Sequence, residues 1–182
     1  AQNLKEEDFV KSLTIASTHD YILFFTDMGK VHLRKGYQIP EAGRTARGTA
    51  IVNVLPLEAG ESVTAMVITR EFDDNEFLMM VTRKGTVKRI PFIALKTNRK
   101  TGIRAITLEE GDHLINVIRT NGNDNILLAT AQGMAICFNE NDVRPMGRDA
   151  AGVRGISLSD GDFVVGAEKA EEGKTLLTVT VN

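Results

Sequence analysis

A four-residue pattern, Thr-x-x-Gly, recurs three times in this chain of 182 residues. The copies are Thr26-Asp27-Met28-Gly29, Thr82-Arg83-Lys84-Gly85 and Thr130-Ala131-Gln132-Gly133, and each follows a short apolar run. The tetrad period is 56 residues, then 48. A period near 50 residues, built from strands and glycine turns, is typical of blade arrays. The pattern therefore predicts a series of small sheets.

Two later glycines accompany each tetrad at similar spacing. The three sets are Gly29, Gly48 and Gly60, then Gly85, Gly102 and Gly111, then Gly133, Gly152 and Gly161. An acid follows the last glycine of each set, as Glu61, Asp112 or Asp162. The alternative is a pair of stacked sandwiches with chance glycine spacing, but three glycines in three copies favour a true repeat.

Short runs rich in β-branched residues, bounded by Gly, Asp and Asn, predict the strands. We expect strands at residues 13–17, 21–26, 30–34, 50–55, 63–68, 77–82, 86–90, 114–119, 126–130, 134–138, 163–167 and 175–181. No window of 12 or more residues shows a convincing helical period, so the chain is predicted to be all-β. Each copy supplies about four strands, one blade of a propeller-like array. The tetrad glycine is expected to form the turn between the first two strands, because such turns need positive φ.

The last residues resemble the start of another copy. Residues 176–182 form a fourth apolar run, with Thr180 and Asn182 at the first and third tetrad positions. We expect the natural protein to continue beyond this point. The predicted organisation is one partial array with repeats at about 20–70, 75–120 and 124–170 and the start of a fourth at 174–182.

Composition narrows the class of protein. The chain has no Trp and few aromatic residues, so its cores must be aliphatic. No stretch reaches the roughly 18 apolar residues of a membrane span, and the first residues lack the pattern of a secretory signal. The single cysteine, Cys137, lies in an apolar run and is expected to be a buried small hydrophobe. These features favour a cytoplasmic location.

The charges are segregated although the net charge is only −2. Residues 77–108 contain eight Lys or Arg and no acid, and residues 29–48 contain five against one acid, Glu41. Acids collect around the third glycine of each copy. Stacked repeats would therefore carry a basic rim and an acidic rim, which is the electrostatic footprint of a polyanion-binding surface.

Enzyme-like constellations are not found in the sequence. The histidines His19, His32 and His113 have no partner at i+4 and no cysteine cluster, which argues against a metal site. Nucleophile-elbow and phosphate-loop motifs are also absent. Tyr21 and Tyr37 are expected to be structural. The sequence therefore favours a binding module over an isolated enzyme.

The basic glycine loops at residues 44–48, 98–104 and 148–154 are the better candidates for function. Glycine lets backbone N–H groups approach a phosphate closely, and the flanking cations neutralise its charge. Several such loops on one rim would give strong, salt-sensitive binding without sequence specificity. Arg104 and Arg154 occupy the same repeat position, and the alternative for them is a bracing role through buried hydrogen bonds.

Several segments together resemble a known family. These are residues 5–9, 16–26, 37–48 and 51–57, joined by Val143-Arg144-Pro145-Met146-Gly147 and Gly152-Val153-Arg154-Gly155-Ile156. They are similar to the C-terminal domains of bacterial DNA gyrase A subunits, and the similarity covers essentially the whole chain. The tail of the topoisomerase IV A subunit is the alternative.

The resemblance implies a six-bladed β-pinwheel in which blades exchange strands and whose basic outer edge wraps double-stranded DNA. This chain would supply about three and a half of the four-stranded blades. The family's basic heptapeptide, Q-R-R-G-G-[KR]-G, is not in this sequence. The resemblance also implies a bacterial, nucleoid-associated protein whose partners are the B subunit and the N-terminal region of the A subunit. Mg and ATP would serve the whole enzyme, which introduces negative supercoils, and no cofactor is expected in this fragment.

We therefore predict a non-catalytic DNA-wrapping module whose cations lie along one curved edge. The predicted DNA-binding residues are Arg34, Lys35, Arg44, Arg47, Lys84, Lys88, Arg89, Arg99, Lys100, Arg104, Arg148 and Arg154. Sequence preference is expected to come from DNA deformability. A protein-interaction propeller is the alternative from another class, and it predicts no salt-dependent DNA affinity.

Overall fold

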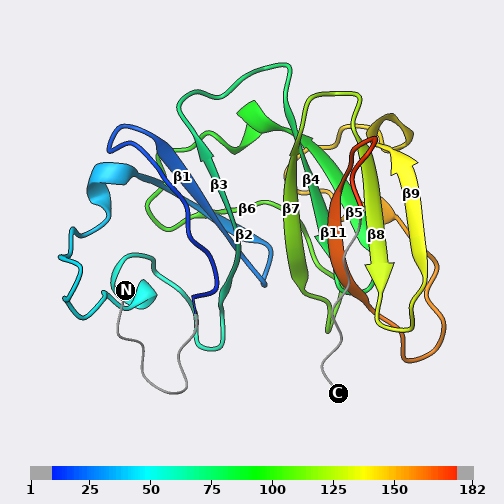
Figure 1. Ribbon diagram of the computed structural model, residues 1–182, viewed down its shortest axis with the longest axis horizontal. Coiled ribbons are helices and arrows are strands. Elements are labelled where there is room, and N and C mark those ends of the chain that lie inside the picture. Colours follow the sequence, from blue (N-terminus) through cyan, green and yellow to red (C-terminus); the bar gives the residue numbers. More distant parts are fainter. Residues whose placement is uncertain (1–9, 176–182) are drawn as a thin grey trace.

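The computed structural model describes residues 10–175, which form three antiparallel sheets lying side by side (Figure 1). The first sheet has the order β3-β1-β2-β6, and the second has the order β7-β4-β5-β10. The third has the order β11-β8-β9. The all-β prediction is confirmed, because the helices of the described residues are 3-10 turns of three or four residues. None of these helices is long and apolar enough to cross a membrane.

Each repeat contributes three consecutive long strands to its own sheet. The bounds are β1 Tyr21–Thr26, β2 Lys30–Lys35, β3 Val63–Thr69, β4 Phe77–Thr82, β5 Thr86–Pro91, β7 Leu114–Thr120, β8 Asn125–Thr130, β9 Ala135–Asn139 and β11 Val164–Ala170. The short helices are η1 Gly36–Gln38, η2 Ile51–Asn53, η3 Phe92–Leu95 and η4 Glu140–Asp142. The sheets approach one another most closely at β3, β7 and β11. The opposite side of each sheet is called its outer edge below.

The outer edge of a sheet is completed by the following repeat. Strand β6 (Ile103–Arg104) comes from the second repeat and pairs with β2 of the first, with Lys30 opposite Arg104. Strand β10 (Val153–Arg154) comes from the third repeat and pairs with β5 of the second. Neighbouring repeats are therefore interlocked through exchanged strands of two residues each.

The tetrad forms the turn that the sequence predicts. Gly29, Gly85 and Gly133 have φ of 77°, 85° and 84°, and each donates its N–H to the carbonyl of the tetrad threonine. The threonine Oγ1 accepts the N–H of the residue after that glycine, at 3.1 Å between Thr82 and Thr86. The threonine thus stabilises the turn, because its hydroxyl closes the same turn that the glycine permits.

The acid after the third glycine also fixes this turn. Asp112 Oδ1 accepts the N–H of Lys84 at 2.9 Å, and Asp162 Oδ1 accepts the N–H of Gln132 at 3.0 Å. In the first repeat, Thr26 Oγ1 donates to Glu61 Oε1 at 2.6 Å. These carboxylates were expected to contribute to an acidic rim, but they are engaged in structural hydrogen bonds.

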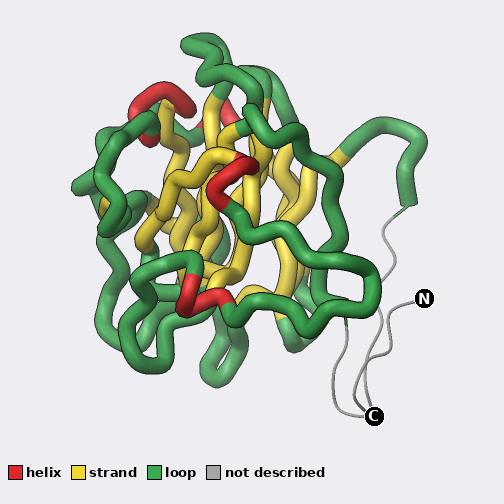
Figure 2. The backbone as a smooth tube through the Cα atoms, turned by 90° about the vertical axis from the view of Figure 1, so that its left-hand side faces the viewer, coloured by secondary structure: helices red, strands yellow, loops and turns green. Residues whose placement is uncertain are grey.

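Apolar layers fill the spaces between the sheets. Leu23 and Phe25 of the first sheet meet Leu78 and Met80 of the second in one core. The other face of the second sheet packs against the third in a separate core. The free face of the first sheet is covered by residues 39–57, which lie in front of the strands in Figure 2. The second sheet is consequently buried on both faces.

Several sequence predictions are wrong in the described part of the chain. Residues 13–17 form no strand, and the segment expected as a strand at 50–55 contains the helix η2. Cys137 is exposed, because β9 is the edge strand of a three-stranded sheet. The two exchanged strands were not predicted as separate strands. The strand expected at 175–181 lies almost entirely outside the described residues.

Candidate nucleic-acid interface

A polar groove of about 480 Å³ lies at one end of the first sheet's outer edge. Its cationic lining comes from two repeats, with Arg34 and Lys35 from the first and Arg99 and Lys100 from the second. None of the described residues that line it is acidic. Four of the twelve predicted residues are therefore brought together, and we call this the cation groove.

The first two cations of the groove are held in place by the surrounding backbone. Arg34 donates through Nη1 to the carbonyl of its neighbour Leu33 at 2.9 Å and through Nη2 to the Lys100 carbonyl at 3.0 Å. Lys35 donates through Nζ to the His19 carbonyl at 2.9 Å. Both side chains are half-buried, and burial lowers the pKa of the Arg34 guanidinium. Since the pKa of an arginine is normally far above 7, the Arg34 guanidinium stays charged despite this shift. Its hydrogen bonds to the two carbonyls fix its orientation.

The other two cations are carried on the loop that leads to β6. Arg99 and Lys100 are exposed, and a turn between the Arg99 carbonyl and the Gly102 N–H, at 3.3 Å, closes the loop beneath them. Gly102 has φ of 79°, which favours glycine. Arg104 follows on β6 itself and is exposed. The loop thus presents cations along the outermost part of the first sheet.

The second sheet repeats this arrangement with residues of the third repeat. Arg148 lies on the loop before β10, and Arg154 lies on β10 at the position equivalent to Arg104. Both are exposed, as is Arg104. The alternative of a buried bracing role for Arg104 and Arg154 is therefore wrong. Loops from successive repeats place cations on the outer edges of successive sheets.

Two predicted contact residues are placed in the interior. Lys88 is 0% exposed, and Arg89 is 4% exposed. The Arg89 guanidinium lies over the Phe77 ring, and its Nε is 3.1 Å from Glu140 Oε2. Neither side chain can touch a phosphate from this position, so both are removed from the candidate interface. The physical reason is that they lie on a strand of the sheet that is packed on both faces.

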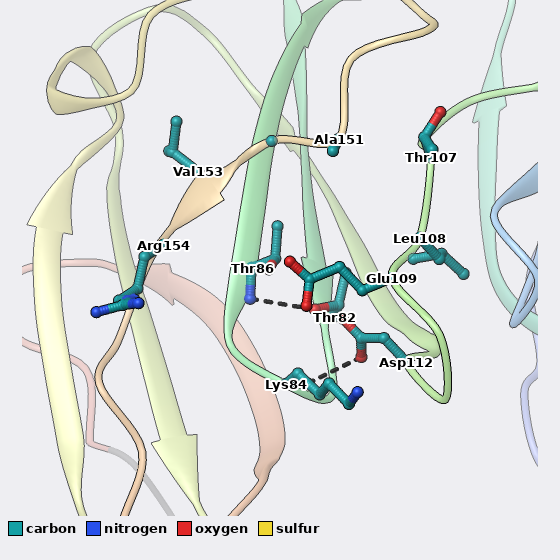
Figure 3. Close-up of a pocket in the computed structure, with 11 residues that line it drawn as sticks. Thr82, Lys84, Thr86, Thr107, Leu108, Glu109, Asp112, Ala151, Val153 and Arg154 are labelled. Carbon is teal, nitrogen blue, oxygen red and sulfur yellow. Dashed lines mark hydrogen bonds between the residues drawn. The ribbon is translucent and has the colours of Figure 1, made fainter.

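Lys84 lies among carboxylates. A depression of about 390 Å³ is lined by Lys84 and Arg154 together with Glu109 and Asp112 (Figure 3). Lys84 donates through Nζ to the Glu110 carbonyl at 2.6 Å. In Figure 3 the Arg154 guanidinium points away from the two carboxylates. The predicted separation into basic and acidic rims is wrong at this place, because the tetrad turn and the third-glycine turn lie at the same end of the sheet.

Arg44 and Arg47 lie on the segment that leaves the cation groove. Tyr37 and Gln38 line the groove, and residues 39–57 then run onto the free face of the first sheet. Both arginines are exposed there. Their role as DNA contacts stays a prediction, as it does for the other exposed and half-buried cations.

The groove also contains residues that the sequence argument did not assign to binding. Tyr37, Gln38, Thr97 and Asn98 line it and offer hydroxyl and amide groups beside the cations. Such groups contact phosphate oxygens and sugars in protein–DNA interfaces. Their position beside the basic residues in both loops is the signal that could have identified them. Within residues 10–175, no cluster of three or more His, Cys, Asp or Glu could hold a metal ion.

Comparison with known proteins identifies the family of this chain. A family model described as the DNA gyrase C-terminal domain, β-propeller, matches residues 20–70, 76–121 and 124–171. The DNA gyrase A subunit of Clostridium acetobutylicum is 48% identical over 155 residues, which are 85% of this chain and 19% of that protein. The corresponding protein of Klebsiella oxytoca is 46% identical over all 182 residues, or 21% of its length. The chain thus spans about a fifth of these relatives.

Solved structures share the same fold. The C-terminal domain of DNA topoisomerase IV aligns with a TM-score of 0.80 and 29% identity, covering 85% of this chain and 48% of that one. A DNA gyrase A C-terminal domain aligns with a TM-score of 0.69 and 24% identity, covering 86% and 50%. The fold described above therefore recurs in these solved structures.

Proposed function

The chain belongs to the DNA gyrase C-terminal β-propeller family, and from this we propose that it is a non-catalytic module that binds and wraps duplex DNA. The observation that carries the proposal is the cation groove, where side chains of two repeats converge without a carboxylate. A duplex would lie against this groove and continue past Arg104 toward Arg148 and Arg154 on the second sheet.

Phosphate contacts would supply the free energy of wrapping. Smooth bending of a 20–30 bp site by 40–90° costs about 1–6 kcal/mol, which several contacts per sheet must offset. The interlocked sheets would supply these contacts from a scaffold whose outer edges are held together by exchanged strands. Sequence preference would then come from the ease of bending, because phosphate contacts carry no base information.

Within the whole enzyme, this module would act beside parts that the chain does not contain. We infer an A subunit whose N-terminal region works with a B subunit in an ATP-dependent type II topoisomerase that introduces negative supercoils. Mg and ATP would bind those other parts, and the module would act in the bacterial cytoplasm at the nucleoid. The equivalent domain of topoisomerase IV is the alternative, supported by the TM-score of 0.80.

Charge reversal in the cation groove tests the proposal. We expect Arg99→Glu/Lys100→Glu to weaken binding of a fluorescent duplex by about tenfold or more at low salt, because two phosphate contacts become repulsive. The slope of log K against log salt should fall by about 2. Binding would be measured by anisotropy titration between 50 and 200 mM salt.

The matched control is Arg70→Glu/Lys169→Glu, which changes the net charge equally. Arg70 directly follows β3 and Lys169 lies in β11, so both are on the side of their sheets opposite the outer edges. This variant should bind nearly as the wild type does. An equal loss of DNA affinity in the two variants would show that the effect depends on net charge alone. A wild-type chain without salt-dependent DNA affinity would favour the protein-interaction alternative.

A further inference from the structure

The buried Lys88 makes contacts that relate it to the interface. Its Nζ donates to the carbonyls of Ala105, Arg148 and Ala150 at 2.8, 2.6 and 2.9 Å. Ala105 follows the exchanged strand β6, and the other two carbonyls belong to the loop before β10. One ammonium group therefore joins segments of the second and third repeats at the outer edges of two sheets.

This ammonium is unusual because no carboxylate forms an ion pair with it among the described residues. Its three N–H donors match three backbone carbonyls, which saturates the group. Burial lowers the pKa of Lys88 to about 8, while the Asp149 carboxylate opposes that effect. An apolar side chain would fill the same space without the cost of burying a charge. The presence of a lysine here is therefore better explained by the backbone carbonyls that it binds than by packing.

The loop it holds is the one that carries Arg148. Thr107 binds the same loop, with Oγ1 donating to the Asp149 carbonyl at 3.1 Å. The carbonyls of residues 148, 149 and 150 are thus all bonded to Lys88 or Thr107, while the Arg148 side chain is exposed. The loop backbone is fixed while its cation faces solvent.

The first sheet contains an equivalent contact made by a different residue. Gly102 and Gly152 correspond in the repeat, so the carbonyls of Lys100 and Ala150 are equivalent. Arg34 Nη2 donates to the Lys100 carbonyl at 3.0 Å, as Lys88 donates to that of Ala150. In both sheets a cation of the preceding repeat holds the basic loop of the next at the same backbone atom. Two independent occurrences argue for a device that positions the loop.

We propose that Lys88 is a positioning residue for DNA binding, which fixes the loop before β10 so that Arg148 meets a phosphate. The proposal rests on the proposed DNA-wrapping function. Lys88 does not touch DNA, and it acts through Arg148. This positioning role also explains why a lysine lies inside a sheet that is packed on both faces.

A double-mutant cycle tests the proposal on the 182-residue chain. Lys88→Met and Arg148→Ala should each weaken duplex binding by about five- to tenfold at 0.1 M salt, and each should reduce the salt slope by about 1. The double variant should be no weaker than either single variant, because Lys88→Met already removes the contact of Arg148. The control cycle pairs Lys88→Met with Arg99→Ala, whose loop Lys88 does not hold, and its effects should add.

A role in general stability would make the two cycles equal, and that result would overturn the proposal. Unchanged affinity of folded Lys88→Met would overturn it as well. If this variant does not fold, Thr107→Val takes its place, because Thr107 holds the same loop from a more accessible position; it should couple to Arg148 and not to Arg99. A wild-type chain without DNA affinity would refute the proposed function together with this inference, whereas weakened binding by Arg99→Glu/Lys100→Glu with additive Lys88 cycles would refute this inference alone.

Discussion

The position three residues after each tetrad glycine shows how context decides the role of a side chain. It holds His32 in the first repeat, Lys88 in the second and Ile136 in the third. Lys88 is saturated by backbone carbonyls of the next repeat, whereas neither ring nitrogen of His32 has a hydrogen-bond partner. Ile136 lies on the edge strand β9 and is partly exposed. The burial and hydrogen bonding of the residue at this position therefore depend on which segment of the following repeat packs against it.

The unpartnered His32 gives a prediction about acid stability. Burial is the main cause that lowers the pKa of His32, aided by Arg34 and Lys30 and opposed by Glu61. The unfolded chain therefore takes up a proton as pH falls through about 6.5, while the folded chain resists it. The stability present above pH 6.5 should be lost as pH falls toward the lower, folded pKa, by about 1.4 kcal/mol for each unit between the two values.

Urea unfolding of the wild type and of His32→Leu at pH 7.5 and 5.5 measures this effect. The substitution should remove part of the pH dependence, whatever it does to stability at neutral pH. His19→Gln is the control, because His19 is exposed, and it should keep the wild-type dependence. An unchanged pH dependence in His32→Leu would show that the buried ring carries no such penalty.

At the scale of the elements, the exchanged strands depend on glycines that tolerate close approach. Gly152 has φ of 99°, and a Cβ there would lie 2.6 Å from the Val87 carbonyl oxygen and 3.0 Å from Thr86 Cγ2. Gly161 has φ of 76°, but a Cβ there would meet nothing within 4 Å. The two glycines share a left-handed backbone conformation, with positive φ, and differ in the space available for a Cβ atom.

We expect Gly152→Ala to destabilise the chain by about 1–3 kcal/mol more than Gly161→Ala does. Both variants carry the cost of positive φ, but only the first forces β10 away from β5. Equilibrium unfolding in urea measures the difference. Equal losses in the two variants would mean that the pairing of β10 yields easily and contributes little.

Elements with local signals could be predicted, and those that depend on distant partners could not. The bounds of β1 and β4 follow from an apolar run that ends in a tetrad turn. Strands β6 and β10 have two residues each and are defined by partners about 70 residues earlier in the chain, so no local pattern marks them. The residues at 50–55 are apolar because they cover the first sheet, which produced a false strand signal.

The same limit applies to the candidate interface. Loops with exposed cations were predicted because glycine and basic residues mark them locally. Lys88 and Arg89 were misassigned because a cation in a strand is expected to face solvent, whereas these two neighbours point to opposite faces of a sheet that is packed on both faces. The convergence of Arg34 and Lys35 with Arg99 and Lys100 needed the exchanged strand to bring two repeats together.

At the scale of the whole molecule, the repeats are coupled at many places. Tyr21 of the first sheet contacts Phe72, with ring centroids 5.2 Å apart, and Phe72 in turn contacts Phe92 of the second repeat at 4.9 Å. Arg119 of the second sheet donates to the Ile68 carbonyl of the first. With the exchanged strands, these contacts predict that the described sheets unfold together.

The distribution of tyrosines makes this testable. Both tyrosines, Tyr21 and Tyr37, lie in the first repeat, and the chain has no Trp. Tyrosine fluorescence therefore reports the first repeat, and far-UV circular dichroism reports the whole chain. The two urea transitions should coincide, and Gly152→Ala, at the edge of the second sheet, should shift both midpoints equally. A fluorescence midpoint that does not move with this variant would show that the first sheet unfolds independently.

Strand exchange also constrains how such a chain can be cut into fragments and how it can gain or lose repeats. A complete first sheet requires residues 21–104, and a complete second sheet requires residues 77–154. The two stretches overlap from residue 77 to 104, so no single cut yields both sheets intact. Deleting one repeat would leave its predecessor to accept a strand from a new neighbour. Any surviving array must therefore keep its donor strands interchangeable, which limits the freedom of each repeat to diverge in sequence.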